Sequence, residues 1–144
     1  MLVLKILESK ADNTVLTVTR DMSVADVSAY LSSKRIGAVV VSADGTTAEG
    51  ILSERDIVRE LGRRGASSLK DQVSSIMTRD PVTCSPDESA DQVLEKMTEG
   101  RFRHLPVVAD GKMVGLISIG DVVKARLAEL AMEKDALEGM IMGH

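Results

Sequence analysis

Gly50-Ile51-Leu52-Ser53-Glu54-Arg55-Asp56 returns in altered form as Gly115-Leu116-Ile117-Ser118-Ile119-Gly120-Asp121. Both stretches read glycine, two apolar residues, serine, two variable residues and aspartate. The similarity extends to either side, since thirteen of thirty-nine positions are identical when residues 16–45 and 50–58 are aligned with 82–111 and 115–123. An internal repeat over most of the chain indicates a duplicated unit. The lead-in segments match as well, as Val3-x-x-Ile6-Leu7 and Val73-x-x-Ile76-Met77.

Each copy predicts the same order of elements. In both, a serine precedes apolar residues at helical spacing, and Ser23-x-x-Asp26 and Ser89-x-x-Gln92 are typical of capping boxes. Apolar runs then predict two strands joined by an Asp-Gly turn, at 38–41 and 50–52 in the first copy and at 105–108 and 114–117 in the second. A second helix follows each motif, and short extended segments at 15–18 and 82–84 precede the first helix.

The expected fold class is α/β (α+β), with two βαββα repeats. We place the first repeat at 1–66, a polar linker at 67–73, the second repeat at 74–128 and a helical extension at 129–144. A half of about sixty residues buries too little surface alone, so the halves should pack around a pseudo-twofold axis with two clefts between them. Apolar residues near the C-terminal end predict a long amphipathic helix that serves as a dimer or partner surface: Leu127, Leu130, Ala131, Leu137 and Ile141.

Composition excludes several classes of function. A net charge of −4, no Trp, one Tyr and one Phe disfavour a nucleic-acid binder, which needs basic patches and stacking platforms. Cys84, His104 and His144 are too few for a zinc site, so no metal is expected. The single cysteine allows no internal disulfide, and we expect a cytoplasmic protein. No apolar stretch approaches the ~20 residues of a membrane span, and residues 1–8 do not read as a signal peptide.

The repeated Ser-x-x-Asp phrase has two interpretations. It is an ordinary helix N-cap, with Ser53 or Ser118 as the cap residue and the aspartate at the third helical position. The same geometry also suits a nucleotide, because a helix N-terminus offers free N–H groups to a phosphate. A carboxylate one turn into the helix can accept hydrogen bonds from both hydroxyls of a ribose. The spacing fits both roles.

The whole pattern resembles a tandem pair of cystathionine β-synthase (CBS) domains, the arrangement called a Bateman module. The two Gly-apolar-apolar-Ser-x-x-Asp phrases, the Asp-x-Ser helix starts at 21–23 and 87–89, and Arg101-Phe102-Arg103-His104-Leu105-Pro106-Val107-Val108 carry the resemblance. It covers residues 3–128, and no attached catalytic domain is expected.

The resemblance implies binding of adenosine-containing ligands, namely AMP, ADP, ATP, S-adenosylmethionine or NAD-type dinucleotides, in the two clefts. By this analogy Asp56 and Asp121 hold the ribose hydroxyls, and Ser53 and Ser118 lie at the ribose–phosphate junction. The adenine is expected against Thr17, Val18, Ala38, Thr83, Cys84 and Pro106. Family members commonly form flat, disc-shaped dimers and act as sensors whose ligand changes the conformation or assembly of a partner.

The two copies differ where a phosphate would lie. Arg55 can reach a phosphate, whereas its counterpart Gly120 cannot. Arg103 and His104 stand where the first copy has Gly37 and Ala38. If these cationic groups converge on one cleft, that cleft prefers a polyphosphate or dinucleotide and the other a less charged ligand. The alternative is that Arg103 and His104 form a solvated strand edge.

The predicted function is a regulatory adenine-nucleotide sensor that does not transform its ligand. No P-loop, acidic metal cluster or catalytic triad is found in the sequence. Two alternatives remain open: a small enzyme that uses Cys84 or His104, and a scaffold with vestigial clefts that acts through its C-terminal helix. For Cys84, a buried structural thiol is the simpler interpretation.

Overall fold

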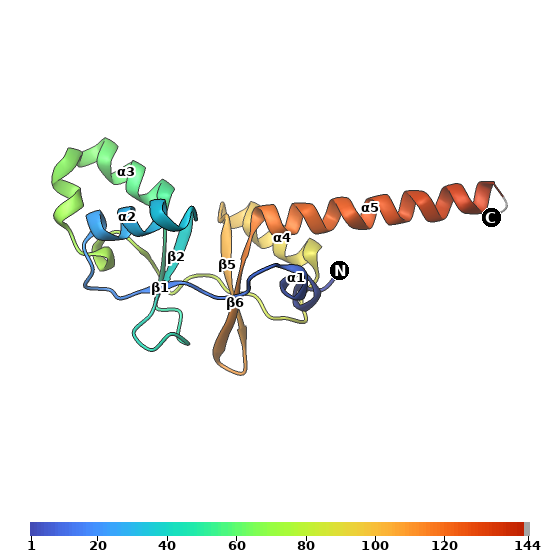
Figure 1. Ribbon diagram of the computed structural model, residues 1–144, viewed down its shortest axis with the longest axis horizontal. Helices are drawn as coiled ribbons and strands as arrows, with labels where there is room; N and C mark the ends of the chain where they lie inside the picture. The colour runs from blue at the N-terminus through green and yellow to red at the C-terminus, as the bar shows by residue number, and fades with distance from the viewer. Residues whose placement is uncertain (143–144) are drawn as a thin grey trace.

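The computed structural model describes residues 1–142, so His144 lies outside the described residues. Figure 1 shows two lobes of strands and helices side by side, with one long helix projecting from the second lobe. The first half contains β1 (Thr17–Val18), α2 (Val24–Lys34), β2 (Ala38–Val41), β3 (Gly50–Ser53) and α3 (Glu54–Arg64). The second contains α4 (Ala90–Gly100), β5 (His104–Ala109), β6 (Lys112–Ser118) and α5 (Ile119–Ile141). The predicted mixed fold of two repeats is confirmed.

The two sheets place the motif serines in equivalent positions. In the first half the strand order is β1-β2-β3-β4, with β1 and β2 parallel and the other pairs antiparallel, and β4 is Thr78–Arg79. In the second half β5 and β6 form an antiparallel hairpin. Ala38 pairs with Ser53 and His104 pairs with Ser118, so each serine ends its strand beside the start of the neighbouring strand.

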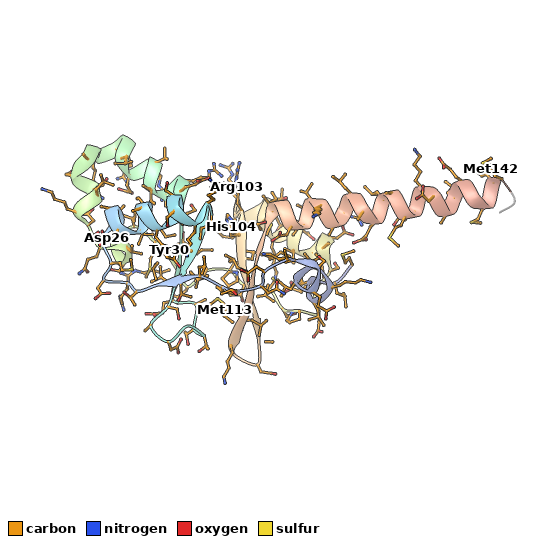
Figure 2. All side chains as sticks on the ribbon, viewed as in Figure 1. Asp26, Tyr30, Arg103, His104, Met113 and Met142 are labelled. Carbon is orange, nitrogen blue, oxygen red and sulfur yellow. The ribbon has the colours of Figure 1, made fainter. Side chains whose placement is uncertain are left out.

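Serine caps start the main helices, as the sequence predicts, with one difference. Ser89 Oγ accepts a hydrogen bond from the N–H of Gln92, and Gln92 Oε1 accepts one from the N–H of Ser89. Ser23 Oγ accepts from the N–H of Asp26 at 3.1 Å, but the N–H of Ser23 does not donate to the Asp26 carboxylate. The predicted box at Ser23 is therefore only half formed, and the exposed Asp26 side chain points to solvent in Figure 2.

Each half has its own apolar core, and the lead-in segments exchange between the two cores. Helix α1 (Val3–Ser9) precedes the first repeat, yet Val3, Ile6 and Leu7 pack in the core of the second half. Figure 1 shows α1 beside the base of α5. Reciprocally, Val73 and Ile76, which precede the second repeat, pack in the core of the first half. The packing therefore crosses the repeat boundaries drawn from the sequence.

The exchange explains why each motif begins with glycine. A Cβ on Gly50 would lie 2.5 Å from Met77 Sδ, and one on Gly115 would lie 2.9 Å from Leu7 Cδ1. Both distances are too short for a real contact. Met77 and Leu7 belong to the lead-in segments, so in each half the glycine makes room for the segment that crosses over.

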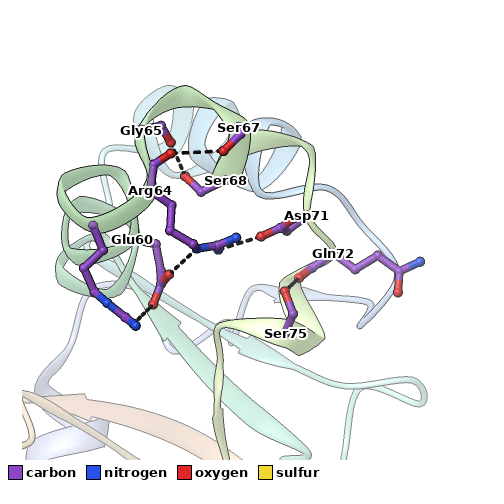
Figure 3. A network of polar contacts seen from close by, with 9 residues as sticks. Glu60, Arg64, Gly65, Ser67, Ser68, Asp71, Gln72 and Ser75 are labelled. Carbon is purple, nitrogen blue, oxygen red and sulfur yellow. Dashed lines mark hydrogen bonds and ion pairs between the residues drawn. The ribbon is translucent and has the colours of Figure 1, made fainter.

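The polar connection between the halves is folded. Residues Gly65–Lys70 and Val73–Ser75 form two short 3₁₀ helices, η1 and η2. Arg64 bonds Glu60 at 3.0 Å and Asp71 at 2.6 Å, and thereby ties the end of α3 to the connection (Figure 3). These carboxylates raise the pKa of Arg64 above its ordinary value, Asp71 most strongly. Among residues 1–142, none of the helices has the length and apolar character that a membrane span requires.

Candidate ligand-binding clefts

The first motif forms a reciprocal cap at the start of α3. The Ser53 Oγ accepts the N–H of Asp56 at 3.3 Å, and Asp56 Oδ2 accepts the N–H of Ser53 at 2.9 Å. The same carboxylate oxygen accepts the Ser53 hydroxyl at 3.0 Å. Arg59, one turn further along α3, contacts the other oxygen, Oδ1, at 3.0 Å. The capping interpretation of the motif is confirmed, and the cap positions the Asp56 carboxylate at the helix N-terminus.

The second motif forms the same cap at the start of α5 but has a different cationic partner. Asp121 Oδ2 accepts the N–H of Ser118 at 2.9 Å, and Ser118 Oγ accepts the N–H of Asp121 at 3.1 Å. Lys10 Nζ donates to Asp121 Oδ2 at 3.1 Å and to the carbonyl oxygen of Leu116 at 3.0 Å. Burial alone would raise the pKa of Asp121, but the bonds from Ser118 and Lys10 outweigh it and lower that pKa below its ordinary value.

The first cleft lies between α3 and the start of β5. Its volume is about 660 Å³, and residues from both halves line it. The first half contributes Ser53 and Asp56, and the second contributes Ser118. Charged and imidazole side chains surround them: Glu54, Arg55, Arg59, Arg101, Arg103 and His104. The cleft therefore has four guanidinium groups against two carboxylates, which favours an anion carrying several charges.

The second cleft lies between the first half and the motif of the second. Its volume is about 490 Å³, and its lining includes Leu16, Ala38, Leu116, Ser118 and Asp121. Lys10, Lys34 and Asp12 add two positive charges and one negative charge beside the Asp121 carboxylate. These side chains make the second cleft close to electrically balanced. The ion pair between Lys10 and Asp121 also occupies part of the acceptor capacity that a ribose would use.

The two clefts share a wall. Gly37, His104 and Ser118 line both of them. Figure 2 shows Arg103 and His104 where the two halves meet. Burial lowers the pKa of His104 from its ordinary value, while the carboxylates of Asp121 and Glu54 act in the opposite direction. His104 is therefore predominantly neutral at pH 7, and it is the titratable group in contact with both clefts.

The structure brings together the residues predicted for phosphate and ribose. Ser53, Arg55, Asp56, Arg103 and His104 line the first cleft, and Ser118, Asp121 and His104 line the second. Of the two residues for which a solvated strand edge is the alternative, Arg103 is exposed and His104 is half-buried. Their role in ligand binding stays a prediction.

The residues predicted to contact adenine occupy varied positions. Ala38 lines the second cleft. Thr17 pairs with Val40 in the parallel β1–β2 ladder, directly after the cleft residue Leu16. The Thr83 carbonyl accepts a hydrogen bond from Lys96. Val18, Cys84 and Pro106 are buried. The part of these six residues in adenine binding stays a prediction.

Sequence reasoning missed several charged cleft residues, among them Arg59, Arg101 and Lys10. Arg59 and Arg101 carried a signal, because Arg59 follows Arg55 by one helical turn and Arg101 belongs to the stretch already singled out. Lys10 carried none, since it lies 111 residues from Asp121 and reaches it only because the lead-in segment crosses to the second half.

Cys84 is unsuited to nucleophilic chemistry. It is 3% exposed in the core of the second half. Burial, with a smaller contribution from Glu88, raises the pKa of its thiol to about 12, so it holds its proton at neutral pH. Within residues 1–142, the side chains of His, Cys, Asp and Glu form no group of three that could hold a metal ion.

Comparison with known proteins identifies the class. The family model of the CBS domain matches residues 11–63 and again residues 73–128. The chain belongs to the CBS domain family, and it carries two copies in tandem. The CBS domain-containing protein CBSX3, mitochondrial, of Arabidopsis thaliana is 35% identical over 145 residues, covering 98% of this chain and 70% of that protein.

Solved structures support the same assignment. The CBS-domain protein ATU1752 from Agrobacterium tumefaciens has a TM-score of 0.83 and 44% identity, covering 88% of this chain and 99% of that one. Two similar structures contain adenosyl compounds. PAE2072 from Pyrobaculum aerophilum is complexed with AMP (TM-score 0.77, 26% identity, 92% and 99% coverage). The CBS domain pair of MJ0100 is complexed with 5′-methylthioadenosine and S-adenosyl-L-methionine (TM-score 0.76, 25% identity, 90% and 98% coverage).

Proposed function

We propose that this chain is a regulatory module that binds adenosine-containing ligands in its two clefts and releases them unchanged. One observation carries the proposal: each half presents a carboxylate, Asp56 or Asp121, at a capped helix N-terminus that lines a cleft between the halves. Similar proteins that hold AMP, or 5′-methylthioadenosine with S-adenosyl-L-methionine, support the ligand class. The buried, protonated thiol of Cys84 argues against the alternative of a cysteine-dependent enzyme.

The two clefts are proposed to prefer different ligands. In the first, Arg55, Arg101 and Arg103 can neutralise two or three phosphates, which fits ADP, ATP or the pyrophosphate of NAD-type dinucleotides. In the second, the charges nearly cancel, which fits AMP, a nucleoside or S-adenosylmethionine. No metal is part of either proposed site.

Regulation is proposed to act by linkage. A ligand that contacts both halves favours the arrangement of repeats or protomers in which both contacts are made, by as much as its affinity differs between the arrangements. We propose that the chain works as a homodimer of the disc-shaped kind known in the family, with a further protein as recipient of the signal. The reduced thiol suits the cytoplasm, which is the proposed location.

Thermal unfolding of extensively dialysed protein tests the proposal. The panel is AMP, ADP, ATP, NAD⁺, NADH, S-adenosylmethionine and 5′-methylthioadenosine. A ligand at 100 times its Kd adds ~2.7 kcal/mol, or roughly 5–10 °C in Tm for a protein of this size. We expect Asp56→Ala to abolish the shift with polyphosphates and Asp121→Ala the shift with less charged ligands.

Each variant is compared with itself, with and without ligand, because removal of the cap lowers Tm on its own. The Ser23→Ala variant, which removes a helix cap remote from the clefts, is the matched control and should keep every shift. The absence of any shift, once copurified nucleotide has been excluded, overturns the proposal in favour of a scaffold. Turnover of an added nucleotide overturns it in favour of an enzyme.

A further inference from the structure

Lys10 is bonded to the carboxylate that the second cleft would offer to a ribose. Its Nζ donates to Asp121 Oδ2 at 3.1 Å and to the carbonyl oxygen of Leu116 at 3.0 Å. The same carboxylate oxygen accepts the backbone N–H of Ser118 at 2.9 Å. A carboxylate oxygen has about two lone-pair positions, so Ser118 and Lys10 together fill Oδ2.

A ribose therefore competes with Lys10 for Asp121. The two hydroxyls of a ribose bind a carboxylate best with one hydroxyl on each oxygen. Oδ2 becomes available for this only when Lys10 moves, because the bond from Ser118 belongs to the cap of α5. A displaced ammonium group that finds no new acceptor loses a charge-assisted hydrogen bond. A ligand that ends at the ribose bears this cost in full, whereas a ligand that carries an anion offers a replacement.

The main chain keeps Lys10 beside the cleft. Its backbone N–H donates to the carbonyl oxygen of Leu7 at 3.2 Å and ends α1, and Leu7 is buried in the core of the second half. The Lys10 side chain is 27% exposed, whereas Arg59, which contacts Asp56 in the first cleft, is 55% exposed. Arg59 can turn from its carboxylate into solvent, but a displaced Lys10 stays close to the bound ligand.

The other charges of the second cleft favour an anion as the new partner of Lys10. Lys34 lines the same cleft and adds a second ammonium group. Asp12 is the other carboxylate in the lining, but its side chain is exposed and its Oδ1 accepts the N–H of Thr14 at 2.8 Å. Once a ribose engages Asp121, two ammonium groups and one carboxylate remain around the rest of the ligand. Such an excess attracts a negative group and repels a positive one.

We propose that Lys10 is a specificity-determining residue of the second cleft. It yields the Asp121 carboxylate to the ribose and pairs with the 5′-phosphate of the same ligand. The cleft thereby selects a nucleoside monophosphate over an uncharged nucleoside and over S-adenosylmethionine, whose sulfonium carries a positive charge at the 5′ position. The inference rests on the proposed function and narrows the ligands given there for this cleft.

Calorimetric titration of the full chain with AMP, adenosine and S-adenosylmethionine tests the role of Lys10, because these ligands share adenine and ribose and differ in the charge at the 5′ position. Every protein carries Asp56→Ala, so that the second cleft is measured alone. We expect AMP to bind most tightly and S-adenosylmethionine least tightly. In Lys10→Met the Kd of AMP should rise by roughly tenfold or more. The Kd of adenosine should stay or fall, because no ammonium group has to be displaced.

Two further variants serve as controls, and circular dichroism checks that all are folded. Lys10→Arg retains a cation and should keep the preference for AMP. Lys5→Met removes an exposed ammonium group from the same lead-in segment, outside the lining of both clefts, and should leave all three affinities unchanged.

The outcomes separate this inference from the proposed function. If Lys10→Met changes the affinities for AMP and adenosine by the same factor, or changes neither, the role of Lys10 is overturned and ligand binding in the cleft stands. Tighter binding of S-adenosylmethionine than of AMP overturns it as well. If neither AMP nor adenosine binds, or if AMP binding survives Asp121→Ala, the proposed function of this cleft fails together with the role of Lys10.

Discussion

Asp56 and Asp121 occupy equivalent positions in the two halves, yet they receive their cations from different parts of the chain. Arg59 belongs to the same helix as Asp56 and is about half exposed. Lys10 reaches Asp121 from the lead-in segment that crosses between the halves, and both side chains are largely shielded. The duplicated motif therefore preserves the cap. Residues outside the motif determine which cation the carboxylate contacts and how exposed that cation is.

The charged side chains that line the clefts around the two carboxylates also differ. The first cleft gathers arginines from both halves, whereas in the second the lysines and aspartates nearly balance. Gly120 in place of Arg55 and Gly37 in place of Arg103 account for two of the four guanidinium groups that distinguish the first cleft. Duplication supplied two clefts with equivalent capped carboxylates, and substitutions at the rim gave them different charge.

The largest predicted effect concerns the exchanged lead-in segments. Ile6→Ala and Ile76→Ala each remove a buried side chain, and each should cost about 2–5 kcal/mol in the free energy of unfolding. Hydrogen exchange should place the damage in the opposite half: Ile6→Ala in β5 and β6, and Ile76→Ala in β2 and β3. Faster hydrogen exchange mainly in the first half of Ile6→Ala would contradict the packing of α1 against the second half.

The two carboxylates should differ in their contribution to stability. Each Asp→Ala change removes a cap, which costs about 1 kcal/mol. Asp121→Ala also leaves the amino group of Lys10 without its carboxylate, so we expect it to lose about 1 kcal/mol more than Asp56→Ala. Urea unfolding of both variants measures the difference. Asp121→Ala combined with Lys10→Met should recover part of the loss, and equal losses in the two single variants would contradict the asymmetry.

The pH dependence of unfolding is a further test of the interactions of Asp121. The folded-state pKa of Asp121 lies below the ordinary value of 3.8, so the unfolded chain binds the proton more readily. The stability from this group is therefore fully present above the unfolded pKa and is lost as pH falls through the folded pKa. The stability gap between wild type and Asp121→Asn should be constant from pH 7 to about 5 and shrink below about 4. A gap that widens in acid would contradict the assignment.

The smallest predicted effect concerns the shared wall. Burial holds the pKa of His104 below its ordinary value in the free protein, and phosphates in the first cleft would raise it. Binding should then take up a proton, and ATP affinity should increase by roughly threefold to tenfold between pH 8 and pH 6. Calorimetry of wild type and His104→Gln isolates the imidazole, because the phosphates of the ligand titrate equally in both experiments. Identical pH profiles of ATP affinity in the two proteins would show that protonation of His104 does not contribute to binding.

Much of the fold was predictable because its signals are local. The helix starts at Ser53, Ser89 and Ser118 depend on residues three positions apart, and the strands depend on short apolar runs. Asp110 and Gly111, which both have positive φ, form the tight hairpin turn that their sequence indicates. The half-formed box at Ser23 shows the limit, because the same spacing does not ensure that the carboxylate turns back.

The sequence by itself determined the duplication, the helix–strand–strand–helix order shared by the two halves, and the two capped carboxylates. Each of these follows from neighbouring residues or from comparison of one half with the other. Only the tertiary structure decided that the lead-in segments exchange, that Lys10 engages Asp121, and that His104 belongs to both clefts. These features join residues far apart in the chain, and their partners are selected by packing and chain path, for which short-range sequence patterns carry no signal.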